Sequence, residues 1–279
     1  MPVLKKDDTG EVGPQGRGDA VVRTGATGWS VSRLAPSADL ASVVDYHWIV
    51  RWDVTSPVPQ AVIPQPVVHV AAERIDGDAR VWVHGVNRAR FVRELRGSGQ
   101  VVASCLRPGG LRPFLTGPVS AVAGRVVPAG DLWATDDATT AQTLLASTAG
   151  DAALVQGWER WLREATPVPD PRVDEIAAWM AHAEPQAEMV RAEQLAEFAG
   201  VGLRTLQRRF DEYVGVGPKW AVRRFRLLDA AAAAHAGAPV DWAELAQRLG
   251  FSDQAHLTRV FTEVVGVSPA AYRRQASLG

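Results

Sequence analysis

The sequence has little of several features that mark particular classes of protein. It holds one cysteine among 279 residues, Cys105, so an internal disulfide is excluded and a reducing compartment is favoured. No run approaches the roughly 18 apolar residues that a membrane-spanning helix needs. The N-terminal stretch MPVLKKDDTGEVGPQGRGD carries charge but no apolar core, so no secretory signal is expected. These absences predict a cytoplasmic protein with no membrane partner.

Catalytic and metal-binding patterns are scarce as well. Three histidines of the N-terminal half, His47, His69 and His84, are scattered, and no His-x-His pair occurs. The sequence has no glycine-rich phosphate loop, and no nucleophile, base and acid stand at a spacing that indicates nucleophilic catalysis. We therefore predict no enzyme activity, no catalytic residue, no cofactor and no metal.

What is present is the composition of a globular protein, 47% apolar and 22% charged, in a chain long enough for two domains. Residues 1–24 are polar and glycine-rich, which predicts a disordered tail. Residues 25–150 contain short β-branched and aromatic runs without amphipathic helices between them, which favours a β-sandwich or barrel of the jelly-roll type. The expected strands are WSVSRL, VVDYHWIVRW, QAVIPQPVVHVAA, ARVWVHGV, FVREL and QVVASCL.

The segments after these strands are of a different kind. RPGGLRPFLTGP (107–118) is too rich in Pro and Gly for a regular element and predicts a loop anchored by Phe114 and Leu115. Residues 151–167 predict a helix over 151–165 and a linker at TPVPDP, with Trp158 and Trp161 on an apolar stripe that packs between domains or, alternatively, forms a dimer. Residues 168–279 predict an all-α domain, so the fold class is α+β with two domains. Its helices are expected over 173–183, 192–199, 203–214, 219–235, 242–249, 254–265 and 269–275.

The helical half repeats itself. LAEFAGVGLRTLQRRFDEYVGVGP aligns with LAQRLGFSDQAHLTRVFTEVVGVSP, and in both copies a short helix ends at a glycine, Gly200 or Gly250, that suits a tight turn with positive φ. A second helix follows, with Gly202 or Ser252 expected as its N-cap, and Asp241 is expected to cap the helix of the second copy with Glu244 in a capping box. The shared VGVxP then ends the second helix at its glycine and starts the next helix at its proline.

This arrangement predicts two helix-turn-helix motifs whose second helices enter the DNA major groove. The formal net charge of the chain is only −1, but residues 204–226 carry seven cations and two acids. Leu206, Phe210, Leu257 and Phe261 are expected to face inward. The outward positions predicted to contact DNA are Arg204, Thr205, Gln207, Arg208, Lys219, Gln254, His256, Thr258 and Arg259, because Arg and Gln bond base edges and cations neutralise phosphates. The alternative is an ordinary solvated helix face.

The segment from about Arg172 to Gln275 resembles the DNA-binding domain of AraC/XylS-type transcription regulators, through LRTLQRRFDEYVGVGPKW and LAQRLGFSDQAHLTRVFTEVVGVSPAAYR. FVRELRGSGQVVASCLRPGGLRPFLTGPVS looks like an N-terminal domain found fused to such domains. The resemblance implies a bacterial regulator that binds double-stranded DNA, with a cupin-like sensor domain, a small-molecule effector, a homodimer and contact with RNA polymerase as possible partners. Ala255 departs from the pattern where a longer side chain would contact a base.

The β-rich half offers one candidate ligand site. Tyr46, Trp48 and Trp52 alternate to one face of an expected strand and, with Trp82, predict an apolar pocket for a planar or hydrophobic effector. Plain core filling is the alternative, as is a domain that serves only for dimerisation or partner contacts. His69 and Glu73 also share one side of a strand, which leaves a metal-dependent cupin enzyme fused to a DNA-binding module as a third alternative.

Overall fold

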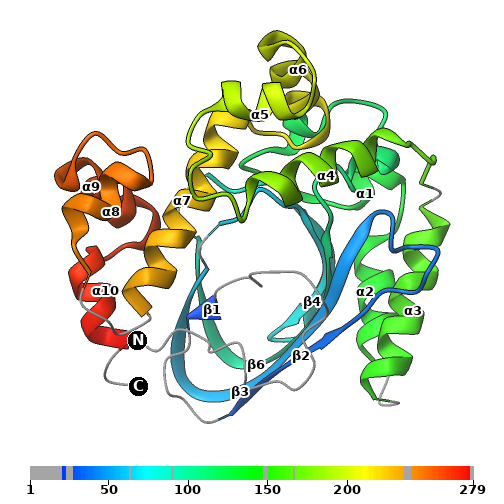
Figure 1. Ribbon diagram of the computed structural model, residues 1–279. Coiled ribbons are helices and arrows are strands. Elements are labelled where there is room, and N and C mark those ends of the chain that lie inside the picture. Colours follow the sequence, from blue (N-terminus) through cyan, green and yellow to red (C-terminus); the bar gives the residue numbers. More distant parts are fainter. Residues whose placement is uncertain are drawn as a thin grey trace.

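The computed structural model describes residues 21–22, 28–62, 64–88, 91–146, 150–165, 167–235 and 240–276. A curved sheet forms the N-terminal half, and helices cover one side and one end of it before the chain continues into a helical C-terminal half (Figure 1). The expected α+β fold class is confirmed. The predicted tail lies outside the described residues except for Val21–Val22, which form β1.

All the described strand pairs are antiparallel and join one seven-stranded sheet, ordered β1-β3-β6-β4-β5-β7 with β2 on the side of β3. The sheet curls strongly, so that one face is convex and the other concave (Figure 1). Besides β1 the strands are β2 (Trp29–Leu34), β3 (Val44–Val62), β4 (His69–Ile75), β5 (Asp78–His84), β6 (Phe91–Leu106) and β7 (Val126–Pro128).

The long strands β3 and β6 differ from the sequence prediction. Residues 43–52 and 60–72 were expected as two strands, but β3 continues to Val62 and β4 begins only at His69. FVREL and QVVASCL are likewise parts of one strand, β6. The register between β3 and β6 shifts between Val54 and Val58. The Pro and Gly signals in SPVP and RGSG therefore mark a bulge in paired strands, where they bend the ribbon without ending it.

Two helices lie along one face of the sheet, α2 (Asp137–Leu145) and α3 (Asp151–Glu164) (Figure 1). Helix α3 was expected almost residue for residue, whereas α2 was missed. Its start signal was Asp136, whose side chain accepts hydrogen bonds from the backbone N–H groups of Ala138 and Thr139. Shorter elements connect the sheet to these helices: η1 (Arg112–Phe114), η2 (Val119–Val122) and α1 (Gly130–Trp133).

The aromatic stripe of α3 packs inside the β-rich half, so its expected role between domains is wrong. Trp158 is fully buried and its Nε1 donates to Ser104 Oγ of β6 at 2.7 Å. Trp161 stacks on Trp158 with ring centroids 4.8 Å apart and lies against Trp133. The stripe therefore attaches α3 to the sheet.

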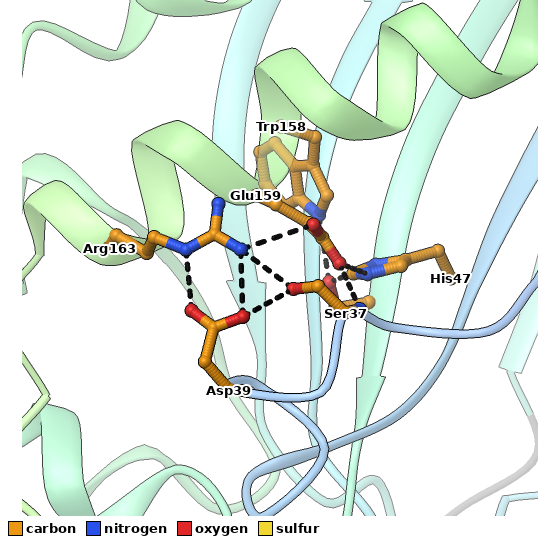
Figure 2. Close-up of polar contacts among 7 residues, drawn as sticks. Ser37, Asp39, His47, Trp158, Glu159 and Arg163 are labelled. Carbon is orange, nitrogen blue, oxygen red and sulfur yellow. Dashed lines mark hydrogen bonds and ion pairs between the residues drawn. The ribbon is translucent and has the colours of Figure 1, made fainter.

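A buried chain of hydrogen bonds adds to this attachment (Figure 2). His47 of β3 has no exposed surface; its Nδ1 lies 2.9 Å from Ser104 Oγ and its Nε2 3.0 Å from Glu159 Oε1 of α3. A carboxylate only accepts, so Nε2 carries the proton and Nδ1 accepts from Ser104. Both ring nitrogens of His47 therefore have a hydrogen-bond partner when the imidazole is neutral. Burial lowers the pKa of His47, and the bond to Glu159 opposes this shift only in part.

The outer end of this network is charged. Arg163 of α3 donates to both carboxylate oxygens of Asp39, at 2.7 and 3.0 Å, and also bonds Ser37 Oγ (Figure 2). The backbone N–H of Ser37 donates to Glu159 Oε1 at 2.7 Å. Helix α3, the start of β3 and the loop before it are therefore fastened together by one continuous network.

The helical half follows the predicted boundaries within one or two residues. Two residues of the expected linker are bonded to the two halves: the N–H of Val168 donates to Pro113 O, and Asp170 accepts from Tyr213 Oη. One hydrophobic cluster runs from the sheet through α3 and α4 to α10. In the described part of the chain, no helix is long and apolar enough to cross a membrane. The helices are α4 (Arg172–Ala183), α5 (Ala192–Phe198), α6 (Leu203–Tyr213), α7 (Pro218–His235), α8 (Trp242–Arg248), α9 (Gln254–Val265) and α10 (Pro269–Ala276).

Candidate nucleic-acid interface and ligand cavity

Two helix-turn-helix units have matching backbone geometry. Gly200 follows α5 with φ +64° and Gly250 follows α8 with φ +75°, the left-handed conformation that glycine adopts without strain. In the first unit the N–H of Val201 donates to Ala196 O at 3.1 Å, and in the second the N–H of Phe251 donates to Ala246 O at 2.9 Å. The repeat in the sequence is thus a repeat of one turn structure.

The caps of the second helices differ from one another. Gly202 caps α6 without a side-chain bond, as expected. The N-cap of α9 is Asp253, which accepts from the N–H of His256, so the expectation of Ser252 was wrong by one residue. Ser252 Oγ lies 3.0 Å from His256 Nδ1 and is already engaged in that hydrogen bond. The Asp253 carboxylate is therefore the better acceptor for the helix N–H. Asp241 caps α8 as predicted, but in the described residues no bond from the Asp241 N–H to the Glu244 side chain completes the expected capping box.

The inward and outward faces of α6 and α9 are those that the sequence predicted. Leu206, Phe210, Leu257 and Phe261 are completely buried. Thr205, His256 and Thr258 are half-buried, and the exposed members of the predicted set are Arg204, Gln207, Arg208, Lys219, Gln254 and Arg259.

The VGVxP phrase has the structural role expected of it. Gly215 and Gly266 end α6 and α9 with φ +85° and +86°. Pro218 and Pro269 are the first residues of α7 and α10, where the missing N–H of proline removes no helical hydrogen bond.

The cation count over residues 204–226 overstated the charge available for DNA. Arg224 and Arg226 are buried at 2% and 1% exposure. Arg226 donates to the carbonyls of Ala183, Glu184 and Gln186 and so caps the C-terminal end of α4.

Arg224 faces the sheet domain instead of solvent. It donates to Arg88 O at 3.1 Å, and burial lowers its pKa to about 10. Arg209 pairs with Glu175 at 2.6 Å. Arg209 and Arg226 therefore hold helices together and Arg224 bonds the N-terminal half, roles that local sequence does not distinguish from DNA contact.

His256 is engaged within the protein. Arg223 Nη2 lies 2.7 Å from its Nε2, and Ser252 Oγ lies 3.0 Å from its Nδ1. A guanidinium only donates, so Nε2 accepts from Arg223. His256 would have to release one of these two residues before it could bond a base.

Helix α6 also contacts the β-rich half. Ser120 Oγ of η2 donates to Asp211 of α6 at 3.0 Å, and Arg112 of η1 lies 3.5 Å from Glu212. A Cβ built on Gly215 would lie 3.1 Å from Val119, so the end of α6 fits closely on η2. The first of the two recognition helices is therefore docked directly on the N-terminal half.

The concave face of the sheet contains a cavity of about 230 Å³. Tyr46, Trp48 and Trp52 line it together with Trp29 of β2, so three of the four aromatic residues predicted for a ligand pocket share one wall. Trp82 lines a separate, adjoining hollow.

One end of this cavity is polar. Glu73 is 6% exposed and accepts from Arg93 at 2.9 and 2.7 Å and from His84 at 3.1 Å. These three residues line both hollows. Sequence reasoning missed Arg93 and saw His84 only as isolated, because three different strands bring the residues together. The available signal was a charged residue, Glu73, inside the apolar run VVHVAAERI.

The described residues contain no group of three or more His, Cys, Asp and Glu side chains that could hold a metal ion. His69 Nδ1 accepts from Trp48 Nε1 at 3.3 Å, and Glu73 is bound to Arg93 and His84. Cys105 is buried, as expected for a small apolar residue in β6. Ser104, His47 and Glu159 form a Ser–His–Glu chain, but Ser104 is fully buried and lines neither hollow.

The two halves of the chain match two different families of known proteins. Residues 195–275 match the family described as a helix-turn-helix domain, and residues 32–128 match a domain of unknown function (DUF6597). The match over residues 195–275 confirms the resemblance to AraC-type DNA-binding domains that was drawn from the two motifs.

The curated relatives RhaS and PqrA match less than half of the chain. It is 32% identical over 112 residues to the HTH-type transcriptional activator RhaS of Enterobacter sp. (strain 638), which is 39% of each protein. It is 28% identical over 106 residues to the probable transcription factor PqrA of Proteus vulgaris, covering 38% of this chain and 86% of PqrA. A solved AraC-type DNA-binding regulator from Chromobacterium violaceum aligns with 37% of this chain and 93% of its own at 21% identity, with a TM-score of 0.34.

Proposed function

We propose that this chain is a cytoplasmic, sequence-specific DNA-binding transcription regulator and not an enzyme. The observation that carries this proposal is the pair of helix-turn-helix units, α5–α6 and α8–α9, with the same turn geometry and with polar outer faces. Two such units in one chain suit an asymmetric DNA site that presents two successive major-groove faces. Relatives that are transcription regulators agree with this function.

The roles of individual residues follow from their exposure. We assign Lys219, at the start of α7, to a phosphate contact. The half-buried Thr205 and Thr258 are assigned to DNA contacts close to the axes of their helices. His256 positions Arg223 and contributes to DNA contact only if it exchanges a partner. The residues assigned to base edges are Arg204, Gln207 and Arg208 in α6 and Gln254 and Arg259 in α9.

The β-rich half is proposed to modulate DNA binding. The cavity wall includes Gly124, Arg125 and Val126, which come directly after η2, and η2 bonds Asp211 of α6 through Ser120. A ligand that displaced this wall would therefore act on the first recognition helix through one short segment. Tyr46, Trp48 and Trp52 are the effector contacts of this scheme, and Trp82 belongs to the adjoining hollow. Homodimerisation and contact with RNA polymerase complete the proposal.

Selection of bound fragments from a genomic DNA library tests this function. The wild-type chain should enrich fragments that share one asymmetric motif with two parts about 10–10.5 base pairs apart. A matched selection with an Arg208→Ala, Arg259→Ala double variant should lose this enrichment. Recovery of fragments without a shared motif, or equal enrichment by the double variant, would contradict the proposed function or its assigned residues respectively.

A further inference from the structure

The aromatic wall of the cavity is separate from the main hydrophobic core. Trp52 belongs to a second cluster with Leu95, Val101 and other residues, and Trp29, Trp48 and Val50 pack against that cluster. The main core uses the opposite faces of the same strands, such as Ile49 of β3 and Val102 of β6. Trp52 thus fills this second cluster, whereas Trp29 and Trp48 are only partly buried against it and line a cavity of about 230 Å³.

The carboxylate of Glu73, at the polar end of the cavity, already accepts hydrogen bonds at both of its oxygens. Burial would raise the pKa of Glu73, but the bonds from His84 and Arg93 outweigh it and hold the pKa at about 2. Glu73 is thus charged, and both its oxygens accept from Arg93. An ammonium ligand between the aromatic rings would find this carboxylate occupied and the guanidinium of Arg93 nearby. Arg33 also lines the cavity and lies over the Tyr46 ring, with its Cζ 4.7 Å from the ring centroid, so the wall does not suit a second cation.

Arg93 has hydrogen-bonding capacity left over. A guanidinium has five N–H donors, and Arg93 gives one from each terminal nitrogen to Glu73. Among the described residues no other partner of this side chain is found, and its side chain is 28% exposed. Since Arg93 lines the cavity, its remaining N–H groups favour an acceptor oxygen on whatever occupies the space.

We propose that this cavity binds a planar aromatic molecule of one or two rings that carries an oxygen acceptor, a carboxylate or carbonyl, directed at Arg93. Its volume is below the about 300–1,000 Å³ of pockets for drug-sized ligands and suits a small ring system. The rings stack against Trp48, beside the Tyr46 ring that Arg33 covers, and the acceptor oxygen accepts a hydrogen bond from Arg93. This inference rests on the proposed function only in identifying the occupant as the effector.

Two probes of equal ring size test the ligand class on the full chain. We expect 2-naphthoate to bind in titration calorimetry and to raise the melting temperature, since a ligand of the folded state stabilises it. The 2-naphthylmethylammonium ion, with a donor cation in place of the acceptor, should bind at least about tenfold more weakly, a difference of about 1.4 kcal/mol. Binding of neither probe, or equal binding of both, would overturn the proposal.

Three variants locate the site. Trp48→Leu removes part of the aromatic wall, and Arg93→Lys keeps a cation beside Glu73 but removes the guanidinium fork; each should weaken 2-naphthoate at least about tenfold. Trp82→Leu, in the adjoining hollow, is the control and should leave the affinity unchanged. Unchanged binding in the first two variants would refute the assigned site.

DNA binding without either probe is measured in parallel. Retained sequence-specific DNA binding with no probe binding would overturn the ligand class alone. Loss of DNA specificity in the wild-type chain would instead contradict the proposed function.

Discussion

Arginines in the helical half divide into two groups by their surroundings. Arg208 and Arg259 are exposed on the outer faces of α6 and α9, whereas Arg224 and Arg226 are buried and bond backbone carbonyls. We expect Arg208→Ala and Arg259→Ala each to cost about 1–3 kcal/mol of specific DNA affinity with little effect on folding. Fluorescence anisotropy with the selected site and with a scrambled site measures this cost. Intact specific affinity in both variants would contradict base contact.

Lys219→Ala supplies the contrast within the same domain. A phosphate contact carries no sequence information, so this variant should weaken specific and scrambled DNA to a similar degree. The dependence of log affinity on log salt should become shallower by about one unit. A loss confined to the specific site would show that Lys219 contacts a base.

His47 gives the attachment of α3 a defined pH dependence. Burial lowers the pKa of this histidine in the folded protein, so below pH of about 6.5 the unfolded chain takes up a proton that the folded chain resists. The contribution of His47 to stability is therefore complete above that pH and is lost as pH falls through the lower, folded pKa.

Substitution of glutamine tests this assignment. Glutamine retains a donor and an acceptor but does not titrate, so His47→Gln should show a smaller drop in melting temperature between pH 7 and pH 5 than the wild-type chain. Glu159, Ser104 and the Arg163–Asp39 pair remain in both chains. Parallel melting curves across this pH range would refute the role of His47.

At the scale of elements, the contact between α6 and η2 depends on one glycine. Gly215 has φ +85°, and a Cβ there would lie 3.1 Å from the side chain and the carbonyl oxygen of Val119. We expect Gly215→Ala to destabilise the fold by about 1–2 kcal/mol through the left-handed conformation, with a further cost from displacement of η2.

Gly217 provides the matched control two residues away. A Cβ at this position meets nothing within 4 Å, so Gly217→Ala should cost only about 0.5–1 kcal/mol, as expected when Ala replaces Gly at an N-cap. Chemical denaturation of both variants measures the difference. Equal, small effects would show that α6 and η2 do not depend on their close approach.

Elements were predictable where the signal was local. The helix-turn-helix units carry their glycines, apolar positions and terminal prolines at fixed spacing, so sequence alone located α5 to α10. The strands β3 and β6 were divided in error, because Pro and Gly mark a bulge and a strand end with the same residues. Helix α2 lies in ATDDATTAQTLLAS, where small and polar residues hide its apolar stripe.

Sites assembled from distant segments were predictable only in part. The aromatic wall came from alternation along β3, a local pattern. Arg93, Glu73 and His84 meet because β4 pairs with both β5 and β6, which no spacing in the sequence indicates. The buried roles of Arg224 and Arg226 were missed for the same reason, since the carbonyls that they bond lie 136 and about 40 residues away.

For the whole molecule, one hydrophobic cluster extends over both halves, and the residues between the halves are bonded to each of them. The two family matches therefore do not correspond to two independent folding units. We expect differential scanning calorimetry of the full chain to show one cooperative transition, with calorimetric and van't Hoff enthalpies that agree. Two resolved transitions would contradict this view.

The docking of α6 on η2 has a consequence for protein engineering. The helical half of this chain cannot be exchanged on its own, because three of its residues fit residues of the other half. Asp211 bonds Ser120, Glu212 lies near Arg112, and Gly215 lies against Val119. A chimera that joined the β-rich half to a foreign DNA-binding domain would need Asp211, Glu212 and Gly215 grafted into that domain. Without them, the two parts would be joined by the chain but would lack the contact between α6 and η2.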